Sequence, residues 1–228
     1  RGNFRPTTLV SMDMIRASSA QFRTEDDIVP LNTYVMTEIT LDTLCSETGE
    51  VDEQDFLDRA NLLTHLGQMV MLTNCDRYKK LLNYLQDYRI GQIGLVMEAR
   101  EMLALINSKY ERNKDGRLLT SFGEIFTRGV TTYIYPELNE GSGELMTSET
   151  LPVPDGMSNL YQHLLDHRHI LDVTGFTESA LHIRSSEVLR KLREDEEGWE
   201  AMVPDKVARY IQEKGLFNFP MQKMEFDY

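Results

Sequence analysis

The sequence is poor in cysteine and in basic residues, and it has no long apolar run. Its 228 residues include two cysteines, too few for the disulfide framework of a small secreted domain, so we expect a reducing compartment such as the cytoplasm. Lys and Arg number 24 against 37 Asp and Glu, and the net charge of −13 disfavours binding to nucleic-acid phosphates or anionic membranes. The longest apolar stretches, such as residues 93–97, are about a quarter of the roughly 20 residues that a bilayer-spanning helix needs. We therefore expect neither nucleic acid nor membrane as a partner.

The rest of the composition is that of an ordinary globular protein. Hydrophobic residues make up 41% and charged residues 27% of the chain, which excludes the collagen-like and disordered classes. One core is the simplest expectation at this length. We therefore predict one α/β domain over residues 1–217, followed by a C-terminal tail over residues 218–228. The tail is rich in aromatic residues and methionine, and it either packs on its own domain or docks on another chain.

Strand-like and helix-like segments alternate along most of the chain. Short segments rich in β-branched and other apolar residues predict strands at residues 33–40, 69–72, 90–97 and 130–135. Segments with helical periodicity lie between them, at residues 53–66, 78–85, 98–110 and 118–126. Strands that are apolar along their whole length suit a parallel sheet covered on both faces. The pattern predicts a Rossmann-like open parallel sheet with flanking helices.

The last third of the chain is expected to be a polar loop followed by a helical C-terminal part. Residues 137–155 are rich in Gly, Ser, Thr, Glu and Pro, which is typical of a solvated loop. Helices are predicted at residues 157–171, 185–193 and 204–214, the last one ended by Gly215. The acidic residues 194–197 are most simply a solvated surface between helices.

Open parallel sheets bind ligands beyond the carboxyl ends of their strands. Polar residues that follow the predicted strands are therefore site candidates, although each of them equally suits a helix cap or a loop. These residues are Glu38, Thr40, Thr73, Asn74, Glu98 and Glu137.

Three further segments carry recognisable motifs. They are GNFRPTTLVS at residues 2–11, IRSSEVLR at residues 183–190, and MVPDKVARYI at residues 202–211 with GLF at residues 215–217. In order and separation they resemble the nucleotidyltransferase superfamily, in particular the nicotinamide and nicotinate mononucleotide adenylyltransferases. That family begins with G-x-F-x-P-x-[HT]-x-G-H, has I-S-S-T-x-I-R at a late helix start, and closes with V-P-x-x-V-x-x-Y-I.

The resemblance implies a nucleotide-binding domain that takes ATP with Mg²⁺ and a mononucleotide, as in NAD biosynthesis. Gly2, Phe4 and Thr8 match the first motif, and Ser185 and Ser186 match the second. The family needs these positions because a glycine turn and a helix N-terminus hold phosphates with backbone amides. By the same resemblance, Thr8 and Arg190 are the candidate catalytic residues.

Some positions depart from the family pattern. Val10 and Ser11 stand where the family has Gly and His. Leu189 stands at the arginine position, and Arg190 follows about 100° further around the helix. If active, the chain is a nucleotidyltransferase. The alternative is a non-catalytic regulatory or structural module of a larger protein or assembly, which Val10 and Ser11 favour.

The start of the chain also departs from the family. There the glycine motif follows the central strand of the sheet, whereas only Arg1 precedes Gly2 in this sequence. That strand is either missing or supplied by a preceding part of a longer polypeptide. We expect the second, because a parallel sheet without its central strand exposes two unpaired edges. The domain is therefore expected to contact a preceding domain or another chain.

Two smaller groups of residues have side chains that could bind a metal ion or act as a nucleophile. His163 and His167 are four residues apart beside Asp166 and His169, and imidazoles at this spacing can converge on one metal ion. No HExxH pattern or cysteine pair completes such a site, so a polar helix surface is favoured and no metal site is predicted. Cys75 precedes a predicted helix, a setting that lowers a thiol pKa, but no base is placed near it.

Overall fold

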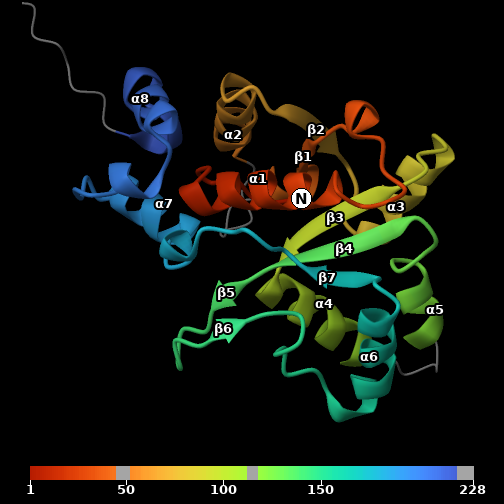
Figure 1. The fold of residues 1–228 in the computed structure, drawn as a ribbon. Helices are drawn as coiled ribbons and strands as arrows, with labels where there is room; N and C mark the ends of the chain where they lie inside the picture. The colour runs from red at the N-terminus through yellow and green to blue at the C-terminus, as the bar shows by residue number, and fades with distance from the viewer. Residues whose placement is uncertain (45–51, 112–117, 220–228) are drawn as a thin grey trace, which may run out of the picture. The chain divides into compact units, whose positions relative to one another are not determined.

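The computed structural model describes residues 1–44, 52–111 and 118–219 (Figure 1). The chain forms two compact units, each built from segments that are distant in sequence. The first unit combines Arg1–Met12, Val35–Asn74 and the chain from Ile183 onward, and the second combines Asp13–Tyr34 with Cys75–His182. Each unit contains its own parallel sheet.

The first unit is built around two parallel strands joined by a helix. Besides the start of α1 (Leu9–Phe22), its main elements are β1 (Met36–Thr40), α2 (Glu53–His65), β2 (Met69–Thr73), α7 (Ser185–Arg193) and α8 (Asp205–Lys214). The register runs from Met36 opposite Met69 to Thr40 opposite Thr73. A parallel pair needs a crossover connection, and α2 lies in the segment that supplies it.

Local signals in the sequence fix the helices of the first unit. The Asp52 carboxylate accepts the Asp55 N–H at 3.0 Å and caps α2 at its start. Gly215 ends α8 at φ 63°, a left-handed conformation that glycine adopts without steric cost. The apolar cluster between α2 and β1 consists of Ile39, Phe56 and Leu63, with Phe4 packed against it.

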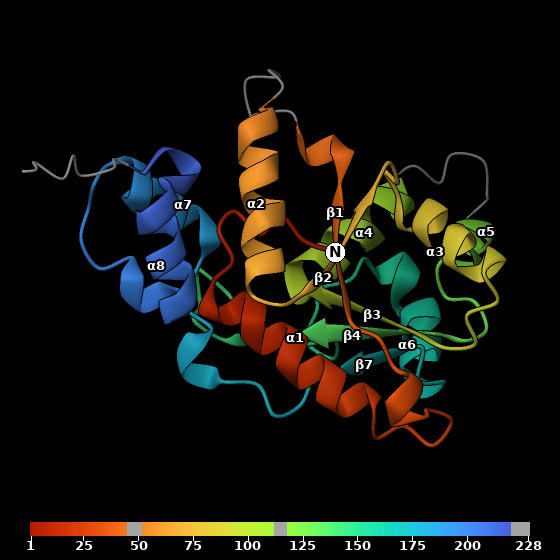
Figure 2. The same ribbon diagram turned by 90° about the horizontal axis from the view of Figure 1, so that it is seen from above.

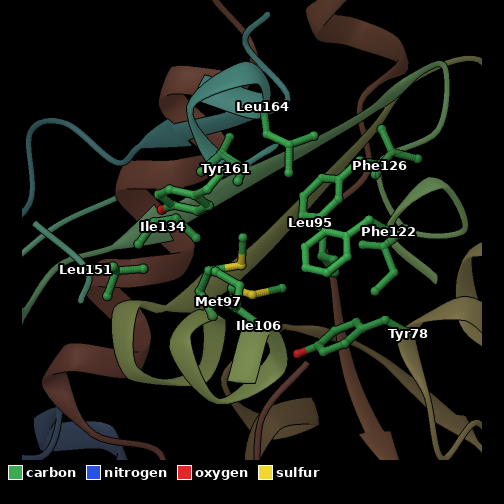
Figure 3. Packing of buried hydrophobic residues seen from close by; sticks show 14 of the residues in the cluster. Tyr78, Leu95, Met97, Ile106, Phe122, Phe126, Ile134, Leu151, Tyr161 and Leu164 are labelled. Atoms are coloured by element: carbon green, nitrogen blue, oxygen red, sulfur yellow. The ribbon is translucent and has the colours of Figure 1, made fainter. Parts of the chain in front are cut away.

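The second unit contains a three-stranded parallel sheet with β4 between β3 and β7. Its elements in chain order, after the larger part of α1, are α3 (Tyr78–Asp87), β3 (Ile93–Glu98), α4 (Ala99–Glu111), α5 (Leu118–Gly123), β4 (Val130–Tyr135), β5 (Glu137–Leu138), β6 (Leu145–Met146), α6 (Ser158–Asp166) and β7 (Ile170–Asp172). Side chains of α3 to α6 pack with those of β3 and β4 in one apolar cluster (Figure 3). The core of this unit therefore lies between the sheet and these helices.

The two faces of β4 have different partners because successive side chains of a strand point to opposite faces. Ile134 joins the apolar cluster with α4 and α6 (Figure 3). Tyr133 and Tyr135 meet α1 instead: the Tyr133 ring lies edge-on to Phe22 at 6.1 Å, and the Tyr135 hydroxyl donates to Asp13 at 2.7 Å. The part of α1 within this unit thus covers the second face of the sheet.

The predicted alternation of parallel strands and helices is confirmed, but the single sheet is not. Strand β4 occupies the predicted residues, and β1 and β3 begin later than predicted, at Met36 and Ile93. Within the described residues the strands form two separate parallel sheets, because β1 bonds to β2 while β3 bonds to β4. An apolar segment identifies a strand but not its neighbour, since pairing depends on contacts with distant segments.

Two predicted segments are wrong in part. The helix predicted over residues 157–171 ends at Asp166, Arg168 adopts φ 57°, and Ile170 begins β7. The short apolar pair that begins at Ile170 fits a helix or a buried strand equally well, so periodicity does not distinguish the two structures there. The polar segment 137–155 was predicted as a loop, yet it contains the antiparallel hairpin of β5 and β6.

Helix α1 was not predicted, because its buried side mixes polar and apolar residues. Val10 and Ala17 are buried, but so are Asp13 and Ser18. An amphipathic helix is identified by an apolar stripe, which these polar residues interrupt.

The membrane expectation can be compared with the described residues, whereas Cys45 and most of the predicted tail cannot. Within residues 1–44, 52–111 and 118–219, no helix is both long and apolar enough to cross a bilayer. Cys45 lies outside the described residues, as does the predicted C-terminal tail from residue 220 on.

Asp13 should make the stability of the second unit depend on pH. Its buried carboxylate accepts hydrogen bonds from Arg16, from the Tyr135 hydroxyl at 2.7 Å, and from the N–H and hydroxyl of Thr177 at 2.8 Å. Burial raises the pKa of this carboxyl, but the hydrogen bonds outweigh burial and hold the pKa below its ordinary value of 3.8. Because the folded-state pKa is the lower one, this stabilisation is present above about pH 4 and is lost as the pH falls through the folded pKa.

We expect Asp13→Asn to lower the free energy of unfolding at neutral pH by about 1–3 kcal/mol, the cost of unsatisfied buried partners. In urea denaturation, the free energy of unfolding of the wild type should fall more steeply below about pH 4 than that of the variant. Asp26→Asn, at an exposed carboxyl of the same unit, is the matched control. Parallel pH profiles of wild type and Asp13→Asn would contradict this role.

Candidate functional site

The motif at residues 2–8 begins against β1. The Gly2 N–H donates to the Glu38 carbonyl at 3.2 Å, and Arg1 donates to both carboxylate oxygens of Glu38, at 2.6 and 3.0 Å. The Thr73 hydroxyl, at the end of β2, donates to the same buried carboxylate. Glu38 and Thr73, two of the predicted strand-end candidates, therefore meet, and together with Arg1 they anchor the start of the motif.

Helix α2 anchors the middle of the motif. Arg5 donates to one Asp55 oxygen at 2.6 Å, and Arg59 approaches the other at 3.0 Å. Arg59 is only 2% exposed and also donates to the Asn3 carbonyl at 3.4 Å. Burial lowers the pKa of Arg59, and the Asp55 carboxylate opposes that shift. The loop is thus fixed by a buried ion pair, while Phe4 packs on the apolar cluster of α2 and β1.

The end of the motif caps α1. The Thr8 hydroxyl accepts the Ser11 N–H at 3.2 Å, and the Ser11 hydroxyl accepts the Thr8 N–H at 3.3 Å. This reciprocal arrangement is a capping box with serine at the third helical position. Helix geometry leaves the N–H groups of Leu9 and Val10 without intrahelical acceptors. The start of α1 therefore presents donors of the kind that bind anions.

The Thr7 side chain stands out beside these donors. It is 0% exposed, and its hydroxyl has no hydrogen-bond partner within the described part of the chain. A buried hydroxyl without a partner costs folding free energy, so such groups are uncommon in native structures. The hydroxyl belongs to the residue immediately before the α1 cap, which makes it a candidate ligand donor.

The second motif forms the start of α7, as predicted. Ser185 is the first residue of α7, Ser186 is exposed, and the N-cap residue Arg184 provides no side-chain cap. This segment belongs to the same unit as residues 2–8. In both views the start of α1 lies beside the C-terminal segment that carries α7 and α8 (Figures 1 and 2).

Arg190, the candidate catalytic cation, is engaged by two carboxylates. Its guanidinium donates to Glu194, and to both oxygens of Glu196 at 2.5 and 3.0 Å. These hydrogen bonds raise the pKa of Arg190, and the bond from Arg190 lowers the pKa of Glu196 to about 2. Both partners therefore stay ionised at neutral pH, and residues predicted as a plain solvated surface neutralise the arginine.

Sequence reasoning missed the groups that hold the loop. Asp55 and Arg59 are four residues apart on α2, a spacing that signals an ion pair but not that it is buried. Asp58 is also buried, and it accepts the Phe217 N–H at 2.9 Å, which ties α2 to the turn after α8. No pattern in the sequence indicates that the Thr7 hydroxyl is buried without a hydrogen-bond partner.

Other predicted candidates have structural roles or lie elsewhere. The Glu137 carboxylate accepts the Arg100 N–H at 2.7 Å and so caps α4 in the second unit. That unit also has a cavity of about 570 Å³ at the amino ends of its strands, lined partly by Glu25, Tyr133 and Arg168. Sheet topology favours ligands at the opposite, carboxyl ends, so the sequence did not predict this cavity.

The described ranges were searched for a metal site and for a disulfide. No group of three or more His, Cys, Asp or Glu side chains there could hold a metal ion. Cys75 is half-buried and forms no disulfide among the described residues.

No protein-family model matches this chain, and no curated protein matches its sequence. The resemblance to nucleotidyltransferases therefore rests on the motifs themselves.

Loss of the Thr8 cap should weaken the first unit. We expect Thr8→Ala to lower the free energy of unfolding by about 1 kcal/mol, the typical cost of removing an N-cap side chain. Thr8→Asp keeps an acceptor for the Ser11 N–H and should stay close to the wild type in urea denaturation. Equal losses in both variants would show that the cap contributes little.

Proposed function

We propose that the first unit binds nucleotide phosphates at residues 2–8 and the start of α1, in a Rossmann-like domain related to the mononucleotide adenylyltransferases. The single observation that carries this proposal is the buried Thr7 hydroxyl without a partner, directly before a helix start with two open N–H donors. A bound phosphate has several oxygens that can accept from these donors, and contact with Thr7 requires the groups that cover its hydroxyl to move, because that side chain is 0% exposed. Anion binding at a helix N-terminus also fits the motif that carries the family resemblance.

The proposed ligand is ATP with Mg²⁺, together with nicotinate or nicotinamide mononucleotide. Leu9 and Val10 would hold a phosphate through their N–H groups, Thr7 through its hydroxyl, and Ser185 and Ser186 would supply further hydroxyls. Mg²⁺ is proposed to accompany the triphosphate, since it commonly keeps phosphate oxygens and water as ligands. ATP, when bound, supplies the adenylyl group of the family's reaction.

A non-catalytic role is the second candidate, favoured by the state of the side chains. The Thr8 hydroxyl is used as a helix cap, and Arg190 is neutralised by two glutamates. Arg5, the remaining cation of the motif, is paired with Asp55. With Val10 and Ser11 at the family's Gly and His positions, this supports a nucleotide-binding regulatory or structural module.

Calorimetric titration with Mg–ATP and with each mononucleotide tests the proposal. The same titration of Thr7→Val tests the role of the Thr7 hydroxyl. We expect this nearly isosteric change to raise the free energy of unfolding by about 1 kcal/mol, because an unsatisfied buried hydroxyl is removed. It should weaken ATP binding at least about tenfold, the effect of one hydrogen bond to a charged group.

Thr132→Val is the matched control, because Thr132 is also 0% exposed with no partner for its hydroxyl, but belongs to the second unit. It should gain similar stability and leave ATP binding unchanged. A wild-type chain that binds no nucleotide, or equal affinities of wild type and Thr7→Val, would refute the proposal.

A further inference from the structure

Two histidine side chains face each other at the end of α6 in the second unit. The ring centroids of His163 and His167 are 4.2 Å apart, and the planes are inclined by 49°. The His167 N–H donates to the His163 carbonyl at 3.1 Å, so helical spacing continues one residue beyond the end of α6. Both side chains are exposed to solvent.

We propose that His163 and His167 form a surface site for a late first-row transition-metal ion, with Cu²⁺ bound most tightly. Imidazole is a preferred ligand of Cu²⁺, Ni²⁺ and Zn²⁺, and affinity for a given site generally peaks at Cu²⁺. The ring centroids are 4.2 Å apart, so rotation of the side chains can bring one nitrogen of each ring to a common ion. Because both rings are exposed, water can complete the coordination.

The neighbouring charged groups leave the pair as a two-ligand site. The Asp166 carboxylate accepts a hydrogen bond from Gln162 at 2.8 Å, and the Arg168 guanidinium is paired with Glu25 at 2.9 Å. No larger group of metal-ligating side chains exists in the described ranges. The site therefore selects by ligand softness, and the hard cation Mg²⁺, which prefers oxygen ligands, should be rejected.

Metal binding would join two successive turns at the point where the chain leaves α6. Arg168 follows the pair with φ 57°, and Ile170 begins β7. An ion bound only by the folded chain raises its stability according to concentration and affinity. The site would thus reinforce the connection between α6 and the edge of the sheet.

Titration of the full chain with Cu²⁺, followed by calorimetry and by the nitrogen splitting in the electron paramagnetic resonance spectrum, tests the site. We expect the spectrum to show two imidazole nitrogens on the bound ion. His163→Gln and His167→Gln should each weaken this binding at least about tenfold, the lower bound for losing even an outer-shell partner of a metal. Circular dichroism confirms that each variant is folded.

His169→Gln is the matched control, since it removes a nearby imidazole and leaves the pair intact. It should bind Cu²⁺ like the wild type, and Mg²⁺ should produce no binding signal. Unchanged Cu²⁺ affinity in both pair variants, an equal loss in His169→Gln, or Mg²⁺ binding that depends on the pair would overturn the assignment.

Discussion

Pyrophosphate release from ATP plus nicotinate or nicotinamide mononucleotide should remain near the uncatalysed background when this chain is assayed. Loss of one preorganised group that meets transition-state charge typically costs about 100- to 1,000-fold in rate. By the proposed resemblance, the position of the family's histidine is taken by Ser11, whose hydroxyl accepts the Thr8 N–H, and that of its arginine by Leu189. Two such losses predict a rate that a coupled pyrophosphate assay does not separate from the blank.

Nucleotide binding is expected to survive these changes, because backbone amides at a helix start do not depend on side-chain identity. The assay is therefore run on chain whose ATP occupancy has been measured by calorimetry. Robust turnover that disappears in Ser185→Ala would contradict the non-catalytic interpretation. It would mean that another cation, such as Arg5 or Arg190, leaves its carboxylate partners and replaces the histidine.

Asp55→Ala should be among the most destabilising single changes in the first unit. It removes the Asp55 carboxylate that lies 3.0 Å from Arg59, a side chain that is 2% exposed, and it releases Arg5 of the motif. Removal of one member of a buried ion pair typically costs about 3–5 kcal/mol, because the remaining charge stays buried without compensation. Urea denaturation followed by circular dichroism measures this loss.

Glu53→Ala is the matched control, since it removes an exposed carboxylate from the same helix. Its free energy of unfolding should stay within about 0.5 kcal/mol of the wild type, as for most surface substitutions. If Asp55→Ala is no more destabilising than Glu53→Ala, the buried pair does not hold the motif in place.

Most elements could be predicted from the sequence where composition and end signals agree. Residues 130–135 are almost entirely β-branched or aromatic and form β4, and α7 runs from Ser185 to Arg193 as expected. Pairing could not be predicted in this way. The sequence contains no local signal that β1 bonds to β2 alone. It also contains none that Ile170 begins a strand which pairs with β4, in a segment whose apolar residues have helical spacing.

The candidate site was only partly accessible to sequence reasoning. The family resemblance implied a phosphate-binding glycine turn at residues 2–8, and in the structure these residues form an anchored loop before α1, a helix that was not predicted. The availability of its side chains depends on tertiary contacts that no local pattern encodes: Arg190 is held by Glu194 and Glu196, and Arg5 is held by Asp55. The hydroxyl of Thr7 is distinguished only by burial without a partner.

Backbone N–H groups at the start of α1 are proposed to bind nucleotide phosphate. Calorimetric titration of Mg–ATP into Leu9→Pro and Leu9→Ala tests this proposal most directly. Proline is favoured at the first helical position but lacks the N–H donor, whereas alanine keeps it. We expect Leu9→Pro to bind ATP at least about tenfold more weakly than Leu9→Ala, which should match the wild type. Equal ATP affinities in the two folded variants would contradict it.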